Sequence, residues 1–167
     1  MTALGALPPP GPGLARAMLG IWRLHSREDH DREGRRLLDP VLGPDTLGML
    51  SFAPGHFAAQ FMKRDRESTA VDAPARPGAA IGVSPARPGA NNSSAANGYD
   101  AYFGTYSVDE RAGTITVRLE GALSPSDIGH VLTREIRVEG DRLIIQLETT
   151  AFDGTPVTRR LVFQRLV

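Results

Sequence analysis

Residues 113–120 have the sequence Gly-Thr-Ile-Thr-Val-Arg-Leu-Glu, in which apolar and polar side chains alternate strictly. In an extended chain, Ile115, Val117 and Leu119 fall on one face, and the polar residues between them fall on the other. Residues 142–148, Arg-Leu-Ile-Ile-Gln-Leu-Glu, carry leucine and isoleucine at the same two-residue spacing. Both segments therefore predict half-buried strands of an antiparallel sheet.

Further extended segments are separated by turn signals at intervals of about 8–12 residues, which is typical of sandwiches and barrels. No amphipathic helix long enough to cover a sheet face lies between them, so the sheet buries its apolar face most economically against itself. The sequence predicts an all-β fold, a single antiparallel barrel of about 8–10 strands preceded by a short helical turn at residues 14–19. We expect strands at residues 20–25, 35–38, 47–53, 56–63, 103–108, 113–120, 131–139, 142–149 and 157–167.

Three segments differ from the strands in composition. Residues 1–13 are rich in proline and predict a disordered leader before a single domain at residues 14–167. Residues 64–97 are rich in proline, alanine and glycine and predict a flexible insertion or a flap, whose end at residues 93–102 is expected to form a short helix. Residues 26–34 are almost wholly charged and predict a solvated loop or the tip of a hairpin.

The composition excludes several classes of function. The chain has 167 residues, 19 Lys+Arg and 19 Asp+Glu, so its net charge of zero gives no basic footprint for nucleic acid. It has no cysteine, which rules out disulfides, a thiolate zinc site and a cysteine nucleophile. The four histidines lack metal-ligand spacing, so no metal site and no cofactor are expected. Without a secretory signal or an apolar run of ~18 residues, the chain is expected to be cytoplasmic and not to span a membrane.

Several short segments are similar to the bacterial and fungal lipocalin-like domain family, whose members have calycin-type β-barrels. The similarity runs in order from about Leu19 to the end of the chain. Each motif alone is weak evidence for the resemblance, and the combination of motifs is stronger evidence. The segments are Gly20-Ile21-Trp22-Arg23-Leu24, Leu42-Gly43-Pro44-Asp45, Gly48-Met49-Leu50-Ser51-Phe52, Pro54-Gly55-His56-Phe57, Tyr102-Phe103-Gly104-Thr105-Tyr106, Glu120-Gly121-Ala122-Leu123-Ser124-Pro125, Gly140-Asp141-Arg142-Leu143 and Arg160-Leu161-Val162-Phe163-Gln164-Arg165.

This resemblance implies a structural role for two residues. In lipocalin-type barrels a tryptophan of the first strand lies at the closed end, and an arginine of the last strand stacks over its ring. On this sequence the two positions are Trp22 and Arg165. Cation–π contact and the guanidinium donors favour such an arrangement.

Aromatic and semi-polar residues near the predicted hairpin and the strand at 103–108 are candidates to line the interior of the barrel. Small-molecule sites are mostly apolar cavities of ~300–1,000 Å³ with a few placed polar groups, and a barrel of about eight strands holds one small ligand. The candidate ligand-binding residues are Phe52, Phe57, Gln60, Phe61, Met62, Tyr102, Phe103, Tyr106 and His130.

Two functions from different classes follow from such an interior. The first is binding of a small hydrophobic or amphipathic molecule. The second is an enzyme of the cyclase, isomerase or hydratase type acting in secondary metabolism, with His56, His130 or Tyr106 as general acid or base. A third alternative is a barrel that is filled by its own side chains and acts through its surface. Formation of a homodimer would be compatible with this alternative.

Overall fold

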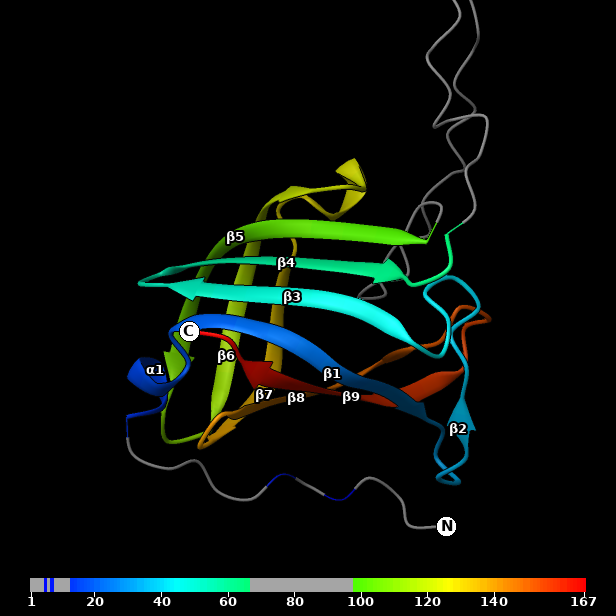
Figure 1. Cartoon of the computed structure of the whole chain (residues 1–167), viewed down its shortest axis with the longest axis horizontal. Helices are drawn as coiled ribbons and strands as arrows, with labels where there is room; N and C mark the ends of the chain where they lie inside the picture. Colours follow the sequence, from blue (N-terminus) through cyan, green and yellow to red (C-terminus); the bar gives the residue numbers. More distant parts are fainter. Residues whose placement is uncertain (1–4, 6, 8–12, 67–97) are drawn as a thin grey trace, which may run out of the picture.

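The computed structural model describes residues 5, 7, 13–66 and 98–167, and its strands form one antiparallel sheet that closes on itself (Figure 1). The strands follow the order β2-β1-β3-β4-β5-β6-β7-β8-β9, and β1 also pairs with β9. In the described part of the chain, eight strands therefore close a barrel and β2 is an additional strand beside β1. The strands are β1 (Gly20–His30), β2 (Arg36–Leu37), β3 (Thr46–Ala53), β4 (His56–Lys63), β5 (Tyr99–Asp109), β6 (Thr114–Ala122), β7 (Val131–Glu139), β8 (Arg142–Thr150) and β9 (Pro156–Arg165).

The predicted all-β barrel is confirmed, and the apolar side chains of the alternating segments point into its core. Ile115, Val117 and Leu119 of β6 are buried, as are Leu143 and Ile145 of β8. The hairpin at Pro54-Gly55 joins β3 to β4, which pair along their whole length from Thr46↔Lys63 to Ala53↔His56. The short helix α1 (Leu14–Ala17) precedes β1, and the 3-10 turn η1 (Pro125–Asp127) precedes β7.

Two local predictions are wrong. Residues 26–30 are not a solvated loop but continue β1, because they pair with β9 as far as His30↔Thr158. Residues 99–102 are not helical but begin β5, where they pair with β4 from Met62↔Tyr99 to Ala59↔Tyr102. In both places, pairing with a neighbouring strand decides the conformation. The local composition gives no sign of this pairing. The predicted leader and insertion lie mostly outside the described residues, at 1–4, 6, 8–12 and 67–97.

One end of the barrel, which we call the α1 end, is closed by α1 and by the packing of its side chains against β1. Leu14, Met18 and Trp22 are buried there, and the indole nitrogen of Trp22 donates a hydrogen bond to the carbonyl of Met18 over 2.8 Å. The guanidinium of Arg165 lies 4.0 Å from the Trp22 ring centre and donates to the carbonyls of Leu19 and Ala17 over 2.8 and 2.6 Å. The opposite end, which carries residues 31–45, is called the loop end.

The wall of the barrel is incomplete between β1 and β3. These strands pair only from Gly20↔Phe52 to Arg23↔Met49, although β3 pairs with β4 as far as Thr46. A bulge between Leu24 and Ser26 turns β1 toward β9, so β1 and β3 diverge (Figure 1). Residues 24–28 of β1 and 46–48 of β3 have no ladder partner on the facing side among the described residues. We call this gap the β1–β3 split.

Candidate functional site

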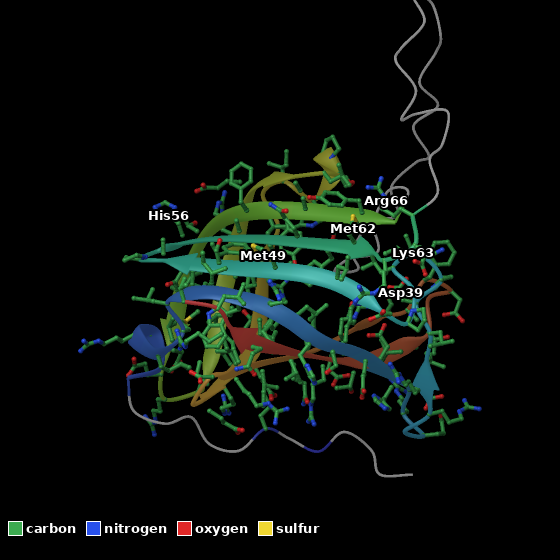
Figure 2. The ribbon with its side chains drawn as sticks, in the orientation of Figure 1. Asp39, Met49, His56, Met62, Lys63 and Arg66 are labelled. Atoms are coloured by element: carbon green, nitrogen blue, oxygen red, sulfur yellow. The ribbon has the colours of Figure 1, made fainter. Side chains whose placement is uncertain are left out.

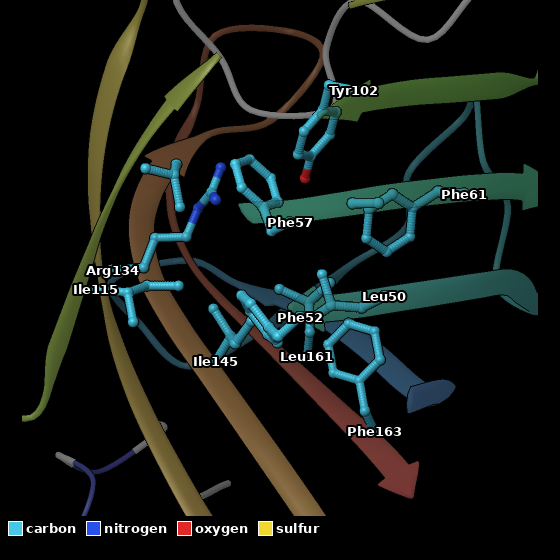
Figure 3. A pocket seen from close by; sticks show the side chains of 12 residues that line it. Leu50, Phe52, Phe57, Phe61, Tyr102, Ile115, Arg134, Ile145, Leu161 and Phe163 are labelled. Atoms are coloured by element: carbon cyan, nitrogen blue, oxygen red, sulfur yellow. The ribbon is translucent and has the colours of Figure 1, made fainter. Parts of the chain in front are cut away.

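The interior of the barrel holds a cavity whose lining is almost wholly apolar. It is enclosed by strands β3 to β9 without β1, and four of its residues were candidates from the sequence: Phe52, Phe57, Phe61 and Tyr102. The aromatic rings contact one another, with Phe61 6.3 Å from Tyr102 and 6.5 Å from Phe163 between ring centres. The cavity is lined by Leu50, Phe52, Phe57, Ala59, Phe61, Tyr102, Ile115, Val117, Arg134, Ile145, Leu161 and Phe163 (Figure 3).

The volume of this cavity is about 20 Å³, enough for about one water molecule. The expectation of ~300–1,000 Å³ is therefore wrong for the described conformation. Interdigitating side chains of seven strands fill the tube, as close packing of a small barrel favours.

Two polar groups point into the apolar interior. Figure 3 shows the hydroxyl of Tyr102, from β5, directed toward the middle of the cavity, and the guanidinium of Arg134, from β7, beside the ring of Phe57. The guanidinium carbon of Arg134 lies 6.0 Å from the centre of the Tyr102 ring, and both side chains are buried. Burial raises the pKa of the Tyr102 hydroxyl, although the nearby positive charge of Arg134 acts to lower it. The phenol is therefore protonated at neutral pH and can donate a hydrogen bond.

A cluster of four buried charges, which we call the ion-pair cluster, lies at the loop end of the interior: Arg27, Asp29, Asp39 and Arg159. Arg159 binds Asp29 with two parallel hydrogen bonds of 2.7 Å, from Nε to Oδ1 and from Nη2 to Oδ2. Arg27 donates to Asp39 over 2.7 Å and lies 3.8 Å from Asp29. Asp39 also accepts hydrogen bonds from the backbone of residues 41 and 42, which places the fully buried Leu42.

The charges of the ion-pair cluster balance, and this sets the ionisation of its members. Burial alone would raise the pKa of Asp29, but the hydrogen bonds and charge of Arg159, with Arg27, outweigh it and lower that pKa below its ordinary value of 3.8. Burial and the neighbouring Arg159 lower the pKa of Arg27, whereas Asp29 and Asp39 raise it. The net effect places the pKa of Arg27 below its ordinary value.

Neither Arg134 nor the ion-pair cluster was predicted from the sequence. Asp29 was expected in a solvated charged run, but its side chain is only 4% exposed. The available signal was the spacing, because Arg27 and Asp29 follow the alternation of Trp22 and Leu24 after one bulged residue. For Arg134, the signal was its two-residue spacing from Ile136 on a strand whose other face carries charges.

Several predicted lining residues lie on the outer surface. Gln60 and Met62 of β4 alternate with the inward-facing Phe61, so they point outward (Figure 2 labels Met62). Phe103 of β5 is 55% exposed for the same reason, beside the inward-facing Tyr102. The alternation could not decide which face of β4 is internal, because both faces are apolar.

The three residues suggested for acid–base chemistry do not line the interior cavity. His56 is exposed on the outer surface of β4 (Figure 2). His130 is exposed as well, and its Nδ1 lies 3.9 Å from an oxygen of Asp127. Tyr106 is half-buried against Phe52, with ring centres 5.2 Å apart, and burial raises its pKa. The described residues contain no group of three or more histidine, aspartate or glutamate side chains placed to hold a metal ion.

Two open hollows lie on the outer surface of β1 and β3–β5. One, of about 370 Å³, lies over the β1–β3 split and is called the outer groove; it is lined by Arg23, Leu24, His25, Asp45, Thr46, Leu47, Gly48, Met49, Gln60, Phe61, Met62, Arg64 and Tyr99. The other, of about 490 Å³, is lined by Gly20, Ile21, Ser51, Phe52, Ala53, His56, Phe57, Ala58, Phe103, Gly104 and Glu120. The outward-facing candidates therefore line surface hollows rather than the interior.

Comparison with known proteins identifies a family for nearly the whole chain. A model of the lipocalin-like domain family matches residues 19–166. No curated protein matches the chain. Among solved structures, the crystal structure of Rv2717c from M. tuberculosis aligns at 19% sequence identity, covering 95% of this chain and 99% of that chain. The TM-score is 0.36, too low for the two folds to be equated. No helix in the part of the chain that the structure describes is long and apolar enough to cross a membrane.

Proposed function

Because this chain belongs to the lipocalin-like domain family, we propose that it binds one small amphipathic molecule in the interior of the barrel. The observation that carries the proposal is the placement of Arg134 and the Tyr102 hydroxyl in an otherwise apolar lining. Ligand sites combine such a lining with a few convergent polar groups. The apolar body of the ligand would contact the phenylalanines, and its polar group would lie at Arg134 and Tyr102.

The volume of about 20 Å³ requires the interior to expand when the ligand binds. Phe61 is the side chain best placed to move, since it lines both the interior cavity and the outer groove. The ligand-free protein would then be the contracted state, in which the aromatic rings occupy the space that the ligand takes. Binding that depends on such a rearrangement is slower than binding to an open pocket.

The test is a fluorescence titration with 1-anilinonaphthalene-8-sulfonate, an aromatic sulfonate that becomes fluorescent in apolar surroundings. Ile145→Phe adds volume to the cavity lining, and Ile144→Phe makes the same change on the other face of β8. We expect Ile145→Phe to weaken binding at least tenfold and Ile144→Phe to leave it unchanged. Circular dichroism checks that both variants fold, because overpacking costs roughly 1–3 kcal/mol.

Native mass spectrometry of the protein purified from cell lysate gives an independent measurement, since a retained molecule would add its mass to that of the chain. Equal probe affinity in Ile145→Phe and the unsubstituted protein, together with a bare chain mass, would contradict the proposal. That result would favour the filled barrel that acts through its surface.

A further inference from the structure

We propose that the outer groove is a second contact site for the ligand and its entrance to the interior, with Phe61 as the side chain that must move. This inference rests on the proposed function, because it concerns how the same ligand reaches the cavity. It differs from entry through an end of the barrel. The route runs through the wall, at the β1–β3 split.

The split is one of two places where neighbouring strands of the described barrel part. Residues 24–28 and 46–48 lack a ladder toward each other, as do residues 131–134 of β7 and 147–150 of β8. Gly48 contributes no side chain to the wall at this point. A Cβ built there would lie 2.9 Å from the Cβ of Leu24 and 3.0 Å from Cδ1 of Phe61, so these two side chains cover the space that Gly48 leaves.

Phe61 separates the outer groove from the interior. It is the one described residue that lines both, and it is buried at 3% exposure. On the side of Phe61 that faces β1, no strand ladder separates the outer groove from the interior cavity. Rotation of this ring away from Gly48 would therefore join them, without breaking a backbone hydrogen bond of β3 or β4.

The two ends offer less access through the described residues. At the α1 end, Trp22 and Met18 are fully buried beneath Arg165, which holds two backbone carbonyls. At the loop end, the ion-pair cluster fixes β1 to β9, and Asp39 holds the segment that carries Leu42. Opening that side would separate buried charges, which costs several kcal/mol.

The chemistry of the outer groove suits an amphipathic molecule with an anionic group. Met49 and Met62 supply apolar, adaptable thioether surface. Arg23 and His25 line the groove, and Arg64, which also lines it, pairs with Asp45. The backbone groups without a ladder partner along the split provide further donors for the polar group.

The test uses an engineered disulfide that pins the split. The chain has no cysteine, so the double variant Leu24→Cys/Gly48→Cys can form one bridge only. The two Cβ positions are 2.9 Å apart, and the strands must separate by roughly 0.6–1.6 Å to reach the roughly 3.5–4.5 Å of a disulfide. The control is Thr116→Cys/Thr133→Cys on the outer surface of β6 and β7, where the hydroxyl oxygens are 3.1 Å apart.

Stopped-flow fluorescence with 1-anilinonaphthalene-8-sulfonate separates the two steps. We expect a fast phase that depends on probe concentration, from binding in the outer groove, and a slower phase independent of it, from entry. The oxidised Leu24→Cys/Gly48→Cys protein should keep the fast phase and slow the second at least tenfold, and dithiothreitol should restore it. The oxidised control should behave as the unsubstituted protein does.

A second pair of variants keeps the inference testable if the bridge prevents folding. Phe61→Leu should accelerate the slow phase about tenfold, whereas Phe152→Leu, at a 50% exposed phenylalanine that lines neither the cavity nor the outer groove, should not. An unchanged slow phase in the oxidised bridge or in Phe61→Leu would overturn the entrance. Absence of probe binding in the unsubstituted protein would instead overturn the proposed function itself.

Discussion

At the scale of single residues, Asp29 shows what a charge inside the barrel requires. Its carboxylate is buried and held by two hydrogen bonds from Arg159. Removing one partner leaves the other charge buried without compensation, which typically costs about 3–5 kcal/mol. We expect Asp29→Asn to lower the free energy of unfolding in urea by about that amount at pH 7. Glu28→Gln, at the adjacent exposed position, should change it by less than about 0.5 kcal/mol.

The same residue gives a prediction for pH dependence. The pKa of Asp29 is lower in the folded chain than its ordinary 3.8, so its stabilisation is fully present above that value. The stabilisation is lost as the pH falls through the folded pKa. Urea unfolding of the unsubstituted protein and Asp29→Asn should therefore converge below about pH 4. A gap that stays constant down to pH 2 would show that Asp29 acts through packing rather than charge.

Arg134 is the residue expected to select the polar group of the ligand. A hydrogen bond to a charged group contributes about 1.5–3 kcal/mol, which corresponds to a tenfold or larger change in affinity. Arg134→Met should weaken binding of 1-anilinonaphthalene-8-sulfonate at least tenfold and binding of its uncharged analogue N-phenyl-1-naphthylamine less than twofold. Arg118→Met, an exposed change on β6, is the control. Equal losses for both probes would assign Arg134 to packing alone.

At the scale of strands, two glycines of the β5–β6 pair test whether the close contact between the two strands leaves room for a side chain. A Cβ on Gly104 would lie 1.9 Å from the carbonyl oxygen of Arg118, which is fixed by the ladder. A Cβ on Gly121 would lie 2.4 Å from the ring of Phe103, an exposed side chain that can turn aside. We expect Gly104→Ala to destabilise the protein by more than about 2 kcal/mol and Gly121→Ala by less than about 1 kcal/mol. Thermal unfolding of both variants decides this, and equal shifts would contradict it.

Prediction from the sequence identifies the strands, but only part of the residues that line the interior cavity. Strict alternation in residues 113–120 and 142–148 identifies both the strands and their inner faces, because one face is plainly polar. On β4 the outward-facing Met62 is as apolar as the inward-facing Phe61, so alternation gives the strand without its orientation. Arg134 and Asp29 keep the two-residue spacing of inward-facing residues, but this spacing alone does not show that a charge at such a position is buried. Their burial depends on partners distant in the sequence.

At the scale of the whole molecule, the barrel closes through its first and last strands. Residues 22–30 of β1 pair with residues 158–165 of β9, so closure requires nearly the whole chain. Folds dominated by such distant contacts fold slowly, in milliseconds to seconds. The single tryptophan, Trp22, lies at this closure, opposite Arg165. Stopped-flow refolding followed by its fluorescence should show its main phase in that range, and a dominant microsecond phase would contradict the expectation.

The position of the closure also has a use in protein engineering. The amide of Ile21 donates to the carbonyl of Val167, and the amide of Leu166 donates to the carbonyl of Ile21, so the carboxyl terminus lies beside the start of β1. A short linker from Val167 to the helix α1 would make the polypeptide circular without altering any strand. New termini opened between Pro54 and Gly55, at the tip of an exposed turn, would then give a circular permutant that retains every strand pairing and begins with β4.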